Sequence, residues 1–180
     1  MDAPISPLLF GLGCNARFVA RCVDTNQKLL PQVLARAKQH KGASFVEILQ
    51  NCIVYNDGVF SAFTEKTNSA DGQVICEHGK PLVFGADRDK GLRLNTDALA
   101  IEVVTIGKGG VTEDDLIIHD ETNRGLATML AALQHPGFPV AMGVLFCRPA
   151  PAYEVLVHDQ IEETTKSSPP TDLNSLMRRG

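Results

Sequence analysis

The sequence predicts an α/β fold with a parallel sheet, and three segments near the start of the chain carry this prediction. RFVARCVD (17–24) has the composition of a strand, and SFVEILQ (44–50) is a second, almost continuously apolar strand. Between them, the spacing of one helix face is kept by Leu29, Leu30, Val33, Leu34 and Ala37. A strand, a helix and a buried strand in this order are typical of a β-α-β unit.

Polar residues and prolines mark the ends of the first helices. Ser6 is a candidate N-cap, and Pro7 suits the first helical position of a short apolar turn that reaches Leu12. Asp24 or Thr25 can cap the helix between the two strands. Pro31 lies inside that helix pattern, so the regular helix is expected to begin near it.

The later part of the chain reads as a less regular mixture of strands and helices. VICEHGKPLVFG (74–85) resembles a hairpin that turns at His78-Gly79. Further elements are expected as strands at 91–95, 99–107 and 138–147 and as helices at 122–133 and 150–166. The tail from Ser167 holds few core-forming residues, which predicts disorder.

Composition limits the classes of function. The 180 residues are 44% hydrophobic and 21% charged, as in a soluble globular protein with one ordinary core. The net charge is −4 and no basic block occurs, which argues against nucleic acid as a partner. No stretch has the length of a membrane span or the pattern of a secretion signal, so a cytoplasmic protein is expected.

The cysteines offer one candidate ligand. All five are scattered without a C-x-x-C pair, which predicts free thiols in a reducing compartment and gives no zinc spacing. Cys52 differs from the others because it follows the predicted strand 44–50, at the strand end where α/β proteins place ligands. One thiolate cannot hold an iron–sulfur cluster, and free cysteines are often buried as small hydrophobic residues. From the residues alone, a small hydrophobic residue without a ligand role is the favoured interpretation of Cys52, with a ligand as the alternative.

HDETN (119–123) is the second polar cluster. His119 titrates near neutrality and could serve acid–base chemistry beside the two carboxylates. The favoured interpretation is a helix start, with Asp120 or Thr122 as the cap and Glu121 near the positive end of the helix.

The order of these segments resembles a known family. MDAPISPLLFGLGCNARFVARCVD, the following segment to EILQNCIVYNDGVF, and later EHGKPLVFG, LIIHDETN and FPVAMGVLFCRPAPAYEVLVHDQ are similar to the β subunit of 2-oxoacid:ferredoxin oxidoreductases, in the 2-oxoglutarate branch. The resemblance covers roughly residues 2–163. It implies a thiamine-diphosphate-binding, doubly wound fold, of which residues 1–56 form the last part. Residues 57–166 would then be the β-subunit extension, and 167–180 a disordered tail.

The resemblance also implies an activity and a set of cofactors. The family converts a 2-oxoacid and CoA to an acyl-CoA and CO2 while reducing ferredoxin, with thiamine diphosphate, Mg2+ and a 4Fe–4S cluster. Its early C-x-x-C-G segment and its G-D-G-D motif are absent from this sequence. In the family, the cysteine of a strand-end QNC or QPC motif completes the cluster. By resemblance, that role falls on Cys52 alone, as a cofactor and metal ligand, and no catalytic residue is assigned.

Two accounts follow from the missing motifs. The chain is either the C-terminal half of a β subunit, inactive alone, or a non-catalytic assembly domain of the same descent. Expected partners are the α subunit, the missing N-terminal half or an intact β subunit, ferredoxin, the 2-oxoacid and CoA. Without the first strands of the parent sheet, an open sheet edge and exposed apolar surface are expected, and with them self-association.

Overall fold

The computed structural model describes residues 4–167 and 172–178. The chain divides into two compact units, residues 1–149 and residues 150–180. In the first unit the strands are β1 (Phe18–Val23), β2 (Ser44–Leu49), β3 (Gln73–Cys76), β4 (Val83–Phe84), β5 (Lys90–Asn95), β6 (Ala100–Thr105) and β7 (Val140–Cys147). Its helices are α1 (Pro7–Gly13), α2 (Leu29–Gln39), α3 (Ser61–Thr64), α4 (Ser69–Gly72), the 3-10 helix η1 (Glu113–Asp115) and α5 (Arg124–Ala131).

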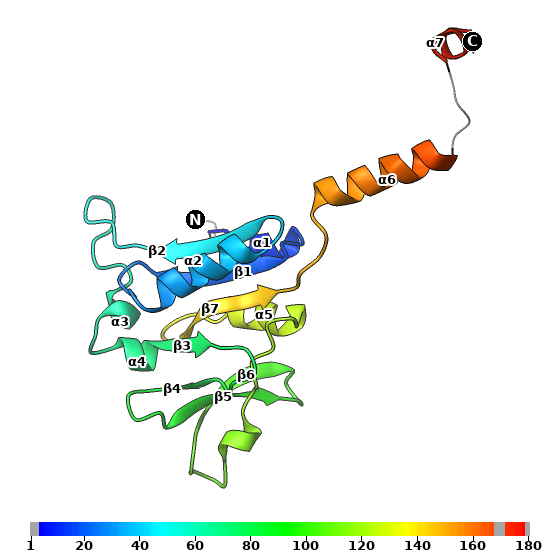
Figure 1. The fold of residues 1–180 in the computed structure, drawn as a ribbon. Helices are drawn as coiled ribbons and strands as arrows, with labels where there is room; N and C mark the ends of the chain where they lie inside the picture. Colours follow the sequence, from blue (N-terminus) through cyan, green and yellow to red (C-terminus); the bar gives the residue numbers. More distant parts are fainter. Residues whose placement is uncertain (1–3, 168–171, 179–180) are drawn as a thin grey trace. The chain divides into compact units, whose positions relative to one another are not determined.

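The main sheet is mixed and has the strand order β2-β1-β7-β3 (Figure 1). β1 and β2 are parallel and joined by α2, which confirms the predicted β-α-β unit. β7 pairs antiparallel with β1 and parallel with β3, so the sheet as a whole is not parallel. The second sheet is an antiparallel meander of β4, β5 and β6.

The predicted hairpin at 74–85 is wrong. Its two strands belong to different sheets: β3 joins the main sheet, and β4 joins the meander. Between them, the Gly79 amide donates to the carbonyl of His119, and Pro81 bridges Ile118. The backbone between β3 and β4 therefore forms its hydrogen bonds with the segment before α5. No local sequence pattern indicates this pairing.

β1 is buried on both faces and its side chains alternate between two cores. Phe18, Ala20 and Cys22 pack with Val33 of α2 on one face. Val19 packs on the other face with α1, α5 and the meander. The buried charge of Arg21 is paired with Glu47, which lies directly opposite in the parallel register. This two-sided burial explains the continuous apolar character of the strand.

A close approach of backbones holds β7 at the centre of the sheet. Gly143 has φ +104°, and a Cβ there would lie 2.9 Å from the carbonyl oxygen of Cys76 on β3. Only glycine meets both requirements without displacing β3. On the far side of β7, Gly143 pairs with Arg21 of β1.

The helix ends partly match the sequence prediction. The Ser6 hydroxyl caps α1 ahead of Pro7, as expected. For α2, the Asn26 carboxamide oxygen accepts from the amides of Lys28 and Leu29, so the prediction of Asp24 or Thr25 is wrong. The reason is register: the chain turns through residues 23–26 before the helix begins, and Asn26 is the polar side chain three residues ahead of Leu29.

The second unit contains α6 (Tyr153–Ser167), where an amphipathic helix was expected, and α7 (Leu173–Met177). α7 is a short helix inside the predicted disordered tail, while residues 168–171 and 179–180 of that tail lie outside the described residues. The proposed partition at residue 56 stays a prediction. Among the described residues, no helix is long and apolar enough to cross a membrane.

Candidate functional site

Cys52 lies in a short closed loop just beyond β2. The Asn56 amide donates to the Cys52 carbonyl at 3.0 Å, and the two residues form an isolated antiparallel bridge. Asn51 fixes the loop from outside: its amide group donates to Asp57 at 2.8 Å, and its oxygen accepts from the Gly58 amide at 2.9 Å. Cys52 is therefore exposed to solvent on a loop whose backbone is held in place by hydrogen bonds.

Large apolar side chains directly follow Cys52 along the loop. Ile53, Val54 and Tyr55 are 77%, 80% and 91% exposed. Three consecutive large apolar residues at this exposure are unusual for a surface that faces only water. They adjoin β2, which is an edge strand of the main sheet, so the expected open edge and apolar surface are both present.

The other cysteines occupy different environments. Cys22 and Cys76 are buried, and burial raises their thiol pKa values to about 11 and about 12. Cys147 is also buried, and its pKa is raised first by burial and then by the Glu121 carboxylate, against a lowering by Arg36. Cys14 is exposed at the end of α1. Buried thiols with raised pKa values are poor nucleophiles and poor ligands at neutral pH.

The donor set around Cys52 does not complete a metal site. In the parts of the chain that the structure describes, no group of three or more histidine, cysteine, aspartate or glutamate residues could hold a metal ion. A 4Fe–4S cluster is held by four cysteines and Mg2+ by a shell of oxygens. The described residues therefore fit neither group as a resident cofactor, and offer two exposed thiols, Cys14 and Cys52.

HDETN has a structural role in this fold. His119 is fully buried, and its Nε2 lies 2.9 Å from the Val144 carbonyl of β7. Burial lowers the pKa of His119, so the neutral ring donates from Nε2 to that carbonyl at pH 7. It lines neither of the cavities described below. His119 therefore attaches this segment to the central strand of the sheet.

The capping prediction within HDETN is wrong in its residue. Asn123 is the N-cap of α5, with its carboxamide oxygen accepting from the Leu126 amide at 3.1 Å. Asp120 accepts instead from the amide and hydroxyl of Thr122, a turn that precedes the helix and lowers the pKa of Asp120. The Glu121 carboxylate forms two hydrogen bonds to the guanidinium of Arg36 on α2, at 2.7 and 2.8 Å. It thus joins two segments 85 residues apart.

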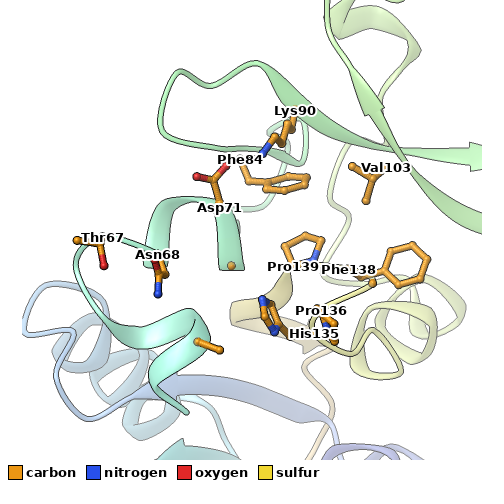
Figure 2. A pocket seen from close by; sticks show the side chains of 13 residues that line it. Thr67, Asn68, Asp71, Phe84, Lys90, Val103, His135, Pro136, Phe138 and Pro139 are labelled. Atoms are coloured by element: carbon orange, nitrogen blue, oxygen red, sulfur yellow. Dashed lines mark hydrogen bonds and ion pairs between the residues drawn. The ribbon is translucent and has the colours of Figure 1, made fainter. Parts of the chain in front are cut away.

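Two cavities lie in the first unit, and no sequence pattern indicated either of them. The smaller one, about 440 Å³, lies between α4, the meander and the segment before β7. Figure 2 shows Asp71 and Lys90 on one side of it and His135 on another. Asp71 and Lys90 form an ion pair at 2.7 Å, which neutralises both charges.

The larger cavity, about 840 Å³, lies where the end of β1 meets α3, α4, β3 and β4. Its apolar wall contains Val23, Ile75, Val83 and Phe84. Its charged side chains are Lys28, Glu65, Lys66 and Arg88. These residues come from three separate parts of the chain, so no spacing rule could have gathered them in advance.

Fold and site together define an α/β domain whose mixed sheet carries an exposed thiol at one strand end and an uncovered apolar edge beside it. No protein-family model matches the chain. Over 120 residues, 67% of the chain, it is 37% identical to the 2-oxoglutarate oxidoreductase subunit KorB of Mycobacterium tuberculosis, of which the match covers 31%. Over 57 residues, 32% of the chain, it is 32% identical to the 2-oxoacid:ferredoxin oxidoreductase subunit beta of Saccharolobus solfataricus, covering 19% of that protein.

By sequence, the chain is similar to a 2-oxoglutarate oxidoreductase subunit and to a 2-oxoacid:ferredoxin oxidoreductase β subunit, and it spans at most about a third of the length of these curated relatives. A solved structure shares its fold, with a TM-score of 0.57 and 19% identity over 98% of this chain and 44% of the other. That structure is a 2-oxoglutarate:ferredoxin oxidoreductase from Magnetococcus marinus with 2-oxoglutarate, coenzyme A and succinyl-CoA bound.

Proposed function

We propose that the chain is the C-terminal part of the β subunit of a 2-oxoglutarate:ferredoxin oxidoreductase. The complete enzyme would convert 2-oxoglutarate, CoA and oxidised ferredoxin to succinyl-CoA, CO2 and reduced ferredoxin. The observation that carries the proposal is the 37% identity over 120 residues to a 2-oxoglutarate oxidoreductase subunit. The free thiols suit the reducing cytoplasm, where we place the enzyme.

Within that enzyme, this chain contributes positioning and assembly. Cys52 is proposed as the last thiolate of a 4Fe–4S cluster whose other ligands come from outside the described residues. The apolar loop Ile53–Tyr55 and the β2 edge would pack against the rest of the β subunit or against the α subunit. Thiamine diphosphate, held with Mg2+ by those other segments, would supply the carbanion chemistry.

A direct assay tests the enzymatic half of the proposal. The purified 180-residue chain with 2-oxoglutarate, CoA, thiamine diphosphate, Mg2+ and a viologen acceptor should give no reduction. A chimera provides the positive arm: the M. tuberculosis β subunit, with its matching 120-residue segment taken from this chain, is combined with its α subunit. We expect that chimera to reduce viologen with 2-oxoglutarate. Turnover by the isolated chain, or a folded chimera without turnover, would contradict the proposal.

A non-catalytic assembly domain of the same descent is the second candidate. It is favoured by the donor set of the described residues, which offers two exposed thiols, Cys14 and Cys52, and no group that could hold a metal ion. The chimera separates the two candidates, because an assembly domain should bind the α subunit in a pull-down without restoring turnover. Pull-down together with turnover supports the subunit role.

A further inference from the structure

The two cavities differ in net charge. In the smaller cavity the charges of Asp71 and Lys90 cancel in an ion pair. The larger cavity is lined by three cationic side chains, Lys28, Lys66 and Arg88, against one carboxylate, Glu65. The neighbouring carboxylates Asp24 and Asp87 are not part of its lining. A net positive cavity stands out in a chain whose formal charge is −4.

The three cations have no partner that would explain their clustering. Among the described residues, the side chains of Lys28, Lys66 and Arg88 form no hydrogen bond and no ion pair. All three are exposed toward solvent at the cavity rim. Three positive charges against the one carboxylate of Glu65 leave a net repulsion in the cavity, and an anion bound among them would relieve that repulsion.

The backbone conformation of Arg88 is an independent indication of a ligand site. Arg88 has φ +54°, a left-handed conformation that non-glycine residues adopt with difficulty, in a turn closed by its own amide on the Gly85 carbonyl at 3.0 Å. Left-handed residues of this kind concentrate at ligand sites. Here the strained turn carries a guanidinium, whose planar fork suits the oxygens of a phosphate or carboxylate.

The wall of the cavity indicates the chemical character of the remainder of the ligand. Val23, Val83 and Phe84 are buried behind it, and Ile75 of β3 presents an exposed apolar side chain to it. Thr25, Thr64 and Ser69 add hydroxyl donors among the cations. A few polar groups on an apolar wall are the usual design of a small-molecule site.

We propose that the larger cavity binds a phosphorylated small molecule with an apolar body. The phosphoryl group lies among Lys28, Lys66 and Arg88, and the apolar body lies against Ile75 and Phe84. Three positive charges match a dianionic phosphoryl group better than a single carboxylate. This site does not involve Cys52 and does not depend on the proposed oxidoreductase role.

Calorimetric titration of the 180-residue chain with phenyl phosphate tests the site, in a low-salt buffer free of other phosphate. We expect saturable binding of phenyl phosphate and none of phenol. Arg88→Gln, Lys66→Gln and Lys28→Gln, made separately, should each weaken binding about tenfold, the usual effect of losing one charge-assisted hydrogen bond. Lys38→Gln, near the end of α2, the helix that Lys28 directly precedes, lies outside the cavity and should change the affinity less than twofold.

Several results would overturn the proposal. They are the absence of saturable binding, equal weakening by Lys38→Gln, and unchanged affinity in all three cavity variants. Tighter binding of glutarate than of phenyl phosphate would assign the cavity to dicarboxylates and contradict the phosphoryl assignment. A melting curve for each variant establishes folding, and because the three cations lie on separate segments, any variant that folds gives a decisive measurement.

Discussion

The main sheet has cysteines in two different environments. Cys22 and Cys76 lie within its strands and are buried, whereas Cys52 follows a strand and is exposed. Cys22 is enclosed on β1 and Cys76 on β3, where burial raises their pKa values to about 11 and about 12. Cys52 lies three residues past Leu49, the last paired residue of strand β2, and is exposed. A position inside a buried strand or just past the end of an edge strand thus separates a core-filling thiol from one available to a ligand.

The largest effect is expected in the chimeric β subunit. Cys52→Ala there should abolish or greatly weaken the 4Fe–4S cluster, because the loop would no longer supply a thiolate and no neighbouring cysteine can replace it. Iron content and the visible absorbance of the anaerobically purified protein measure this loss. Cys14→Ala, which removes the other exposed thiol, is the matched control and should leave the cluster intact. A full cluster in the Cys52 variant would remove Cys52 from the ligand set.

Alkylation kinetics should show the same contrast in the isolated chain. With iodoacetamide at pH 8, Cys52 and Cys14 should react at least about a hundredfold faster than Cys22 and Cys76, whose modification requires local opening of the sheet. Peptide mapping by mass spectrometry over time gives each rate. In denaturant all five rates should converge, which controls for intrinsic reactivity. Equal rates for Cys22 and Cys52 in the folded chain would show that the sheet does not protect its thiols.

A smaller effect is expected on stability at high pH. Above pH 9 the unfolded chain loses the protons of Cys22 and Cys76, whereas burial raises both folded pKa values, so the folded chain keeps the proton of Cys22 until the pH approaches 11 and that of Cys76 until it approaches 12. Fewer protons on the unfolded chain mean that stability falls as pH rises. The fall is about 1.4 kcal/mol per pH unit for each thiol.

Urea unfolding under reducing conditions at pH 8, 9, 10 and 11 measures this slope. The Cys22→Ala and Cys76→Ala variants should each show a shallower decline, although both start from a lower stability because a buried group has been removed. Cys52→Ala serves as the control and should keep the wild-type slope. A wild-type curve with the same slope as the two buried variants would contradict the raised pKa values.

Sequence reasoning succeeded where a feature depends on residues close together in the chain. The strand composition of β1 and the helical spacing of α2 predicted the β-α-β unit, and Ser6-Pro7 predicted the start of α1. It failed where neighbouring residues were equally suited to cap the same helix. Asp24, Thr25 and Asn26 are all good caps, and only the path of the turn selected Asn26.

The hairpin prediction failed for a related reason. The turn at His78-Gly79 has the local chemistry of a hairpin, and Gly79 does adopt a positive φ of +75°. The following residues instead hydrogen-bond to Ile117 and His119, whose position depends on the buried contact of His119 with Val144. Competition from partners 35 to 40 residues away cannot be read from the turn itself.

The sequence by itself determined the β-α-β unit, the free thiols, the position of Cys52 after a strand and the family resemblance, because each depends on local composition or on order along the chain. The tertiary structure alone decided that β7 lies antiparallel beside β1, that His119 is a core residue and that three cations line one cavity. These features arise from contacts between distant segments, where packing and backbone hydrogen bonds select one arrangement from several that the local patterns allow.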